Sequence, residues 1–216
     1  MNEPANETSL LRRIEVTTAI LLSVAGLVSA WASYQASLWG GVQASHYAHA
    51  SAKVTEASRL SIIDGQAFGA DSQIFMAWLE AASAADVARM TFFEHRFSPE
   101  LRTKFDPWRA RHAGDLRQMQ ADPNAPRQFP RPIHREGVEA RALQRAADAE
   151  FEAGEQANRN GDRYVAATVV LSTVLFLGGI SPLLKDTRIR MALLALATLL
   201  GLGASTFIFT LPIEGL

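Results

Sequence analysis

The stretch 164-YVAATVVLSTVLFLGGISPLL-184 contains no charged side chain. After the loop KDTRIR at 185–190, a second stretch of this kind follows, 191-MALLALATLLGLGASTFIFTLPI-213. A helix needs roughly 20 consecutive apolar residues to cross a bilayer core of about 30 Å. Residues 164–184 and 191–213 are therefore predicted to be two transmembrane helices, and the short loop between them predicts a helical hairpin.

A third apolar segment lies near the N-terminus, at residues 14–33, and Glu15 is its one charged residue. It predicts a further transmembrane helix. The alternative is a cleaved signal peptide, because Arg12 and Arg13 precede the apolar core and small residues follow at 28–30. The length of the apolar run favours a helix that stays in the chain and spans the bilayer.

Positively charged residues at the ends of these segments predict their orientation. Arg12 and Arg13 precede the first segment, and three further Lys and Arg residues lie in the loop 185–190. Short loops rich in Lys and Arg stay in the cytoplasm. Residues 1–13 and 185–190 are therefore predicted to be cytoplasmic, and residues 34–163 extracytoplasmic. Four aromatic residues at the outer ends of the spans are expected to form an interfacial belt: Trp31, Tyr34, Trp39 and Tyr164.

The region 34–163 is predicted to be almost entirely helical. The helix of the first span contains no proline and is expected to continue to Ile63, a length of about 75 Å from Ile14. Asp64-Gly65 is expected to end it, and a second helix is expected at 66–96. Together with the spans, this pattern predicts an all-α membrane protein: three transmembrane helices, of which long helices continue into an extracytoplasmic helical bundle.

Two more helices are expected in this region. Ser98-Pro99 is typical of a helix start, with serine as the N-cap and proline in the first turn. This helix is expected to end near Gly114 and to carry Leu101, Phe105 and Trp108 on one face. Four prolines predict a loop at 115–133. The last long helix is expected to begin near His134 and to continue without a stop into the second span.

Small side chains follow one stripe of the first helix at spacings that alternate between four and three residues. The stripe consists of Ala19, Ser23, Gly26, Ala30, Ser33, Ser37, Gly40 and Ala44. This spacing is the heptad period of left-handed supercoils, and small residues let helices approach closely in a bilayer. The stripe is therefore predicted to be a helix-packing seam, against a helix of the same chain or against a second protomer. The first and last long helices are expected to run antiparallel in a tight bundle.

The residue types that carry chemistry form no recognisable site. The chain has no cysteine, which excludes disulfides and thiolate metal sites. His46 and His49 lie three residues apart near Glu56, but no second cluster supplies further metal ligands at a recognisable spacing. The other histidines, His95, His112 and His134, are interpreted as surface residues. No phosphate-binding loop, dinucleotide fingerprint or hydrolase motif is present. We therefore expect no metal, no cofactor and no enzymatic activity.

Charge is nearly balanced over the whole chain, with 21 Lys and Arg against 22 Asp and Glu. Residues 89–145 depart from this balance, with twelve basic against seven acidic residues. This stretch is expected to bind an anionic partner, to pair protomers head to side, or to form a solvated helical surface with local ion pairs. Nucleic acid is not an expected partner, because the region is predicted to be extracytoplasmic.

Three short motifs resemble a group of uncharacterised bacterial inner-membrane proteins, a domain of unknown function. They are AWASYQASLW at 30–39, FSPELR at 97–102, and Ala157-Asn158 ahead of Asp162-Arg163-Tyr164. The resemblance implies one N-terminal span, a helical outer region and a C-terminal two-span hairpin in the bacterial cytoplasmic (inner) membrane. It assigns no chemistry to any residue.

These observations predict a non-enzymatic integral membrane protein, an oligomeric structural or interaction component of the bacterial inner membrane. Its expected partners are the lipid bilayer and either further copies of the chain or another membrane or periplasmic protein. The alternative is an oligomeric ion or small-solute channel, lined by Thr17, Thr18, Ser23, Ser29 and Ser33. A secondary transporter is not expected, because Glu15, at the edge of the first span, is the one acidic or basic residue within the three spans.

Overall fold

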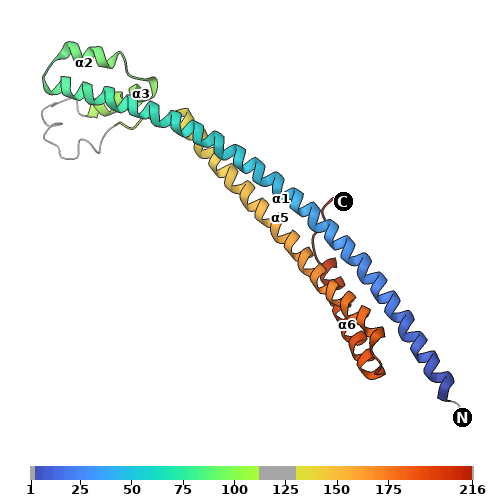
Figure 1. The fold of residues 1–216 in the computed structure, drawn as a ribbon. Coiled ribbons are helices and arrows are strands. Elements are labelled where there is room, and N and C mark those ends of the chain that lie inside the picture. The colour runs from blue at the N-terminus through green and yellow to red at the C-terminus, as the bar shows by residue number, and fades with distance from the viewer. Residues whose placement is uncertain (1–2, 112–129, 216) are drawn as a thin grey trace. The chain divides into compact units, whose positions relative to one another are not determined.

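The computed structural model describes residues 3–111 and 130–215, with side chains from residue 12 onward. Figure 1 shows the helices of these ranges: α1 (Glu3–Ser83), α2 (Val87–Glu94), α3 (Pro99–Arg111), α5 (Arg135–Ile180), the 3₁₀ turn η2 (Ser181–Leu183) and α6 (Thr187–Phe209). No strand occurs within the described ranges, and the predicted all-α fold class is confirmed.

Three of the described helices, α1, α5 and α6, are long and apolar enough to cross a membrane. Since a span takes roughly 20 residues, the 81 residues of α1 and the 46 of α5 extend far beyond one crossing. Both helices therefore contain a candidate span and a long polar continuation, as predicted. The 23 residues of α6 suit a single crossing.

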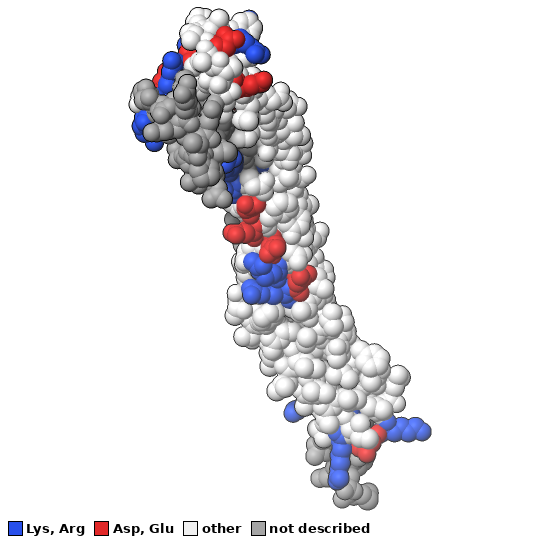
Figure 2. All heavy atoms as spheres, turned by 90° about the vertical axis from the view of Figure 1, so that its left-hand side faces the viewer, with Lys and Arg blue, Asp and Glu red and all other residues white. Residues whose placement is uncertain are grey.

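The chain divides into two compact units, which α1 and α5 both enter. Unit 1 consists of Met1–Ala48 and Glu150–Leu216, and unit 2 consists of His49–Ala149. On the face shown in Figure 2, the lower part of the molecule, which belongs to unit 1, has an uncharged band between charged side chains. The limits 34–163 of the extracytoplasmic region stay a prediction, because this division into units is one of packing rather than of membrane boundaries.

In unit 1, α1 and α5 run antiparallel, as predicted, and the hairpin of α5 and α6 lies beside α1 (Figure 1). Glycines of α5 lie against side chains of α1. A Cβ atom added to Gly178 would lie 2.7 Å from Leu22 Cδ2, and one added to Gly154 would lie 2.4 Å from Tyr47 Cε1. Low numbers on α1 thus meet high numbers on α5, and the glycines allow the close approach.

The core of unit 1 is built from small and aliphatic residues of α1, α5 and α6. Its buried members are Ala25, Ala32, Tyr164, Ala167, Leu171, Val174, Ala197, Ala204, Ile208 and Leu211. On α1, the buried positions Thr18, Ala25 and Ala32 recur every seven residues. The packing of α1 within the chain thus repeats every seven residues, at positions other than those of the predicted small-residue stripe.

The core of unit 2 is aromatic. Phe75 and Trp78 of α1 pack against Phe105 and Trp108 of α3, and the rings of Trp78 and Phe105 meet edge to face at 4.9 Å. Leu101 is fully buried on the same face of α3, so the predicted apolar face of this helix is confirmed. Aromatic pairs of this geometry contribute about 0.5–1.5 kcal/mol beyond the burial of their area.

The break predicted at Asp64-Gly65 is wrong, because α1 continues through both residues to Ser83. A glycine inside a helix costs only about 1 kcal/mol relative to alanine. The helix that continues beyond it buries Phe75 and Trp78, each a contribution of about 1.5–3 kcal/mol or more.

The predicted second helix, 66–96, is therefore divided between α1 and α2. The chain turns where Ala85 adopts a φ of 54°, in the left-handed region. Asp86 then caps α2, and its carboxylate accepts a hydrogen bond from the Arg89 amide at 3.0 Å. The sequence signal for this stop is an aspartate N-cap rather than a glycine.

The predicted start of α3 is confirmed: the Leu101 amide donates a hydrogen bond of 3.0 Å to Ser98 Oγ. Pro107 lies inside α3 without ending it. The predicted end near Gly114 and most of the predicted loop 115–133 lie outside the described residues. The last long helix begins at Arg135 and reaches Ile180, so its predicted continuity is confirmed.

Candidate functional site

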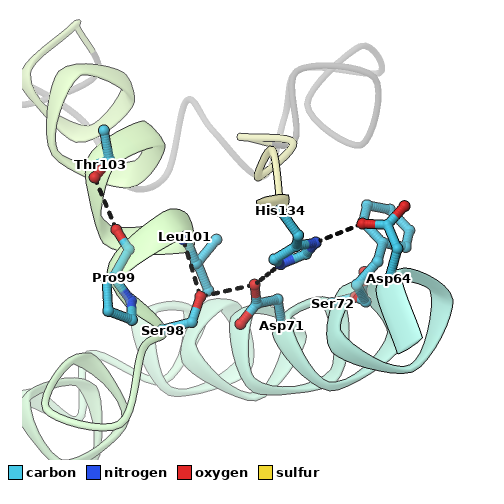
Figure 3. Close-up of polar contacts among 9 residues, drawn as sticks. Asp64, Asp71, Ser72, Ser98, Pro99, Leu101, Thr103 and His134 are labelled. Atoms are coloured by element: carbon cyan, nitrogen blue, oxygen red, sulfur yellow. Dashed lines mark hydrogen bonds and ion pairs between the residues drawn. The ribbon is translucent and has the colours of Figure 1, made fainter. Parts of the chain in front are cut away.

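Four polar side chains from three parts of unit 2 meet in one cluster, drawn in Figure 3: Asp64, Asp71, Ser98 and His134. His134 Nδ1 lies 3.0 Å from Asp64 Oδ1, and its Nε2 lies 3.0 Å from Asp71 Oδ2. Ser98 donates its hydroxyl hydrogen to the same Asp71 oxygen at 2.8 Å. The cluster thus links α1 to the residues that precede α3 and α5.

The protonation state of His134 follows from these contacts. A carboxylate only accepts hydrogen bonds, so both ring nitrogens donate to their partners only in the imidazolium form. Burial, at 6 % exposure, works against this charge and by itself lowers the pKa of His134. The hydrogen bonds to Asp71 and Asp64 outweigh burial, and the pKa of His134 lies above its usual value.

Local sequence explains how the cluster is assembled. Asp64 and Asp71 are seven residues apart, two helical turns, and so lie on one face of α1. His134 immediately precedes α5, and its carbonyl accepts a hydrogen bond from the Val138 amide at 3.4 Å. Gly137, in the first turn of α5, lies against the Asp64 carboxylate: an added Cβ would be 2.4 Å from Asp64 Oδ2.

The arrangement resembles a hydrolase triad in composition but not in connectivity. In a triad, a histidine nitrogen accepts the proton of the serine hydroxyl. Here both nitrogens of His134 contact carboxylates, and the Ser98 hydroxyl donates to Asp71. His134 is therefore not placed to take the proton of Ser98 as the histidine of a triad does, and the geometry is suited to holding three chain segments together.

His134 was predicted to lie at the surface, and this is wrong, because the residue is buried. The signal that could have identified it is the pair Asp64 and Asp71, two acids on the otherwise apolar side of a helix two turns apart. Acids on such a face need a buried cationic partner. Which of the nearby basic residues supplies it depends on the fold of residues distant in sequence.

A pocket of about 630 Å³ opens beside the cluster within unit 2. Asp64 and His134 line it together with the exposed cationic side chains of Lys104, Arg131 and Arg141. The guanidinium of Arg131 also lies 5.4 Å from the ring centre of Phe68. Part of the basic stretch noted in the sequence is therefore gathered around one opening, where an anionic group would be favoured.

The histidines considered as metal ligands are not brought together. His46 Nδ1 lies 2.7 Å from Glu150 Oε2, across the contact of α1 with α5. His49 is exposed, and Glu56 forms an ion pair with Arg59 at 2.6 Å. Among the described residues, no three His, Asp or Glu side chains are placed to hold a metal ion.

The small-residue stripe of α1 lies outside the packing of its own chain. Gly26 is half-buried, and the other seven members are exposed: Ala19, Ser23, Ala30, Ser33, Ser37, Gly40 and Ala44. A Cβ atom added to Gly26 or Gly40 would meet nothing within 4 Å. The positions that pack inside unit 1 are one or two residues away, at Thr18, Ala25 and Ala32. The seam thus has no partner helix among the described residues of this chain.

The motif 30–39 contains residues that hold the C-terminal segment in place. Gln35 is fully buried and makes two hydrogen bonds to the Glu214 backbone: its Oε1 accepts from the amide at 3.0 Å, and its Nε2 donates to the carbonyl at 3.3 Å. Trp39 Nε1 donates to the Pro212 carbonyl at 3.2 Å. The tyrosine of the third motif, Tyr164, donates to the same carbonyl at 3.1 Å.

These contacts correct the predicted aromatic belt. Trp31 and Tyr34 are exposed, as membrane-facing residues would be. Trp39 is half-buried, and Tyr164 is fully buried, so both pack in or against the core of unit 1 instead. Composition alone does not separate these two roles, because an amphipathic ring with one polar atom suits both.

No family model, no curated protein and no solved structure matches this chain. The resemblance of its motifs to a bacterial membrane-protein group therefore stays an expectation. In the structure, Gln35, Trp39 and Tyr164 of these motifs bind the backbone of the C-terminal segment.

Proposed function

We propose that this chain is a non-enzymatic integral membrane protein that self-associates through the small-residue stripe of α1. In this proposal it is a structural or interaction component of the bacterial inner membrane, with residues 34–163 outside the cytoplasm. The observation that carries the proposal is the exposure of the stripe. Eight small residues at heptad spacing face away from the core of their own unit.

The division of the α1 surface supports this proposal. One side of the helix packs within unit 1, at positions such as Ala25 and Ala32. A second side carries large exposed apolar residues suited to lipid: Val16, Ile20, Val24, Leu27 and Trp31. The small stripe is a third side. Small residues offer lipid little contact, but they let a second helix approach closely enough for backbone packing.

The polar cluster of unit 2 supports the absence of catalysis. Its histidine is engaged at both ring nitrogens, and its serine donates to a carboxylate. The base within reach of the Ser98 hydroxyl is the Asp71 carboxylate, whose oxygen is already shared with His134 Nε2, and not a free histidine nitrogen of the kind that commonly activates a nucleophile. The cluster is therefore better suited to fixing the structure of a binding module.

Single cysteines test the interface directly, because the chain has none of its own. Gly26→Cys places a thiol on the stripe, and Val24→Cys places one at nearly the same depth on the large apolar side. In membranes treated with a mild oxidant, Gly26→Cys should form a disulfide-linked dimer and Val24→Cys should not. Equal crosslinking of both variants, or none with Gly26→Cys and with Ser33→Cys, would contradict the proposed interface.

Gly26→Leu separates association from folding. The space around Gly26 accommodates a side chain in the single chain, so the variant should fold and remain in the membrane fraction. Its oligomer should dissociate, as measured by sedimentation in detergent. An unchanged oligomer would count against the seam.

The channel is a second candidate, since Ser23 and Ser33 of the predicted lining are exposed and would face the axis of a ring-shaped assembly. Thr18 of that lining is buried within the chain. Selective ion flux through liposomes that contain the purified protein would favour it. In a scaffold without a pore, the flux should equal that of empty liposomes.

A further inference from the structure

Arg190, in the first turn of α6, is a buried cation in unit 1. The residue is 7 % exposed, and its Nε and Nη2 atoms are fully buried without a hydrogen-bond partner among the described residues. Among the side chains that the structure describes, the nearest carboxylate is that of Glu15 on α1, with 3.9 Å between Nη2 and Oε1. That distance is beyond hydrogen-bond range, and the Glu15 side chain is 65 % exposed.

A guanidinium in this position requires an acceptor. Removing a charged group from water without pairing it costs several kcal/mol, and arginine keeps its charge in proteins. Glu15 offers distant charge but no hydrogen bond. Ser181, at the same end of the α5–α6 hairpin, also has a buried hydroxyl oxygen without a partner. This end of unit 1 therefore contains several buried polar atoms that no described side chain satisfies.

Around Arg190, basic side chains outnumber the acidic Asp186 and Glu15, and the site lies where a span ends. Arg12 and Arg13 precede the apolar segment of α1, and Lys185 and Arg188 lie beside the start of α6; all four are exposed. Figure 2 shows Lys and Arg side chains at the lower end of the uncharged band. An apolar segment that crosses a bilayer ends at the level of the lipid headgroups, whose phosphates are the anions available there.

We propose that Arg190 binds the phosphate of an anionic phospholipid headgroup between α1 and α6. In this site the long Arg190 side chain turns from its buried position toward the headgroups, as arginines near the end of a span do, and its planar guanidinium then presents its donors in a fork that matches two phosphate oxygens. The exposed cations around it draw an anionic lipid in preference to a zwitterionic one. The acyl chains of such a lipid would lie along the apolar faces of α1 and α6, which large exposed residues such as Val16, Ile20 and Leu196 cover.

Glu15 has a defined role in this site. Its carboxylate is close enough to attract Arg190 but too far away to bond it, so it competes with the lipid phosphate for the same cation. Removing its charge should therefore strengthen lipid binding. A simple Glu15–Arg190 ion pair predicts the opposite sign, since the loss of either partner would only weaken the structure. The two explanations are thus separable by one substitution.

The test uses the full chain purified in a non-ionic detergent and titrated with phosphatidylglycerol, phosphatidylcholine or inorganic phosphate. Bound lipid is counted by native mass spectrometry, and the melting temperature is followed in parallel. Phosphatidylglycerol should bind and raise the melting temperature, and the other two should not. Arg190→Gln should weaken phosphatidylglycerol binding at least about tenfold, because charged hydrogen bonds are lost.

Arg188→Gln is the matched control, since it removes the same charge from an exposed position two residues away. It should weaken binding much less, and Glu15→Gln should strengthen it. Arg190→Lys keeps the charge without the fork, and should bind with intermediate affinity even if Arg190→Gln does not fold. The site is overturned if Arg188→Gln and Arg190→Gln weaken binding equally, or if Glu15→Gln lowers stability without strengthening lipid binding. Equal protection by inorganic phosphate would overturn the assignment to lipid.

This site is independent of self-association through the stripe. A dissociated Gly26→Leu variant should still bind phosphatidylglycerol through Arg190. The failure of one proposal therefore leaves the other standing.

Discussion

At the scale of single residues, His134 connects charge to the stability of unit 2. Its pKa is raised in the folded chain, because the hydrogen bonds to Asp71 and Asp64 outweigh the effect of burial. A raised pKa means that the folded state binds the proton more tightly than the unfolded state. The stabilisation is therefore complete below the unfolded pKa of about 6.5, and it is lost as the pH rises through the folded pKa.

This coupling predicts that unit 2 opens more readily in alkaline solution. Hydrogen exchange of peptides that cover 61–75 and 130–140 should accelerate as the pH rises above about 6.5, after correction for intrinsic exchange. In His134→Gln, exchange of these peptides should already be fast at low pH and should show little further dependence. If exchange in His134→Gln kept the pH dependence of the wild-type chain, a group other than His134 would be responsible for that dependence.

Gly137 gives a second prediction at this scale. Gly137→Ala would place a Cβ 2.4 Å from Asp64 Oδ2, so the carboxylate must move and its hydrogen bond to His134 is lost. The expected destabilisation is about 1.5–3 kcal/mol, the range for a hydrogen bond to a charged group.

Gly65→Ala is the control for this change. It lies in the same unit, inside α1, with open space around the added atom. It should stabilise the protein by about 0.5–1 kcal/mol through helix propensity. Denaturation in detergent measures the free energy of unfolding of both variants. If both substitutions changed this free energy equally and in the same direction, the contact of Gly137 with the Asp64 carboxylate would be contradicted.

At the scale of helices, the repeat of small residues along α1 can be recognised in the sequence, but the side of the helix that packs within the chain cannot. The residues of α1 that pack within the chain include Thr18, Ala25 and Ala32, and the predicted stripe that starts at Ala19 lies on another side of the helix, where its role as a packing seam stays a prediction. In a segment where nearly every residue is apolar or small, hydrophobicity does not distinguish an inner side from a lipid-facing side. The face depends on which helix lies opposite, and this is a property of the folded chain.

Helix ends show the same limit. The N-cap at Ser98 was predictable, because its hydroxyl acts on the amide of Leu101, three residues away. The continuation of α1 through Asp64 was not, because the partner of that carboxylate, His134, is distant in sequence. Likewise, Gln35 gives no local sign that it binds Glu214. Local rules identify local partners, and the polar sites of this protein join residues far apart in the chain.

Gln35 provides a prediction about helix anchoring. Gln35→Leu has a similar size but leaves the amide and carbonyl of Glu214 without their partners, at a cost of about 1–3 kcal/mol. The C-terminal peptide should then exchange its amide hydrogens faster and be cleaved sooner by carboxypeptidase. Gln43→Leu, the same change at a half-buried position of α1, is the control and should leave the C-terminus protected.

At the scale of the whole molecule, three long apolar helices are candidate membrane spans. Its proposed orientation rests on the basic residues around Arg12 and Lys185. The orientation predicts that Ser83, exposed near the end of α1, is accessible from outside the cytoplasm. Lys185, exposed in the hairpin loop, should be accessible only from within.

Labelling of Ser83→Cys and Lys185→Cys with a membrane-impermeant maleimide checks this orientation without background, since the wild-type chain has no thiol. In spheroplasts, only Ser83→Cys should react, and Lys185→Cys should react after lysis. The reverse pattern would invert the topology and would place the Arg190 site in the outer leaflet.

The pairing of Gln35 with Glu214 has a consequence for biosynthesis. The two residues are 179 positions apart, and a ribosome that adds 5–20 residues per second needs about 10–40 seconds to travel between them. During that time the newly inserted α1 carries an amide whose partner has not yet been made. The buried amide of Gln35 thus gains its two hydrogen bonds only after the segment with Glu214 has been synthesised and has reached unit 1.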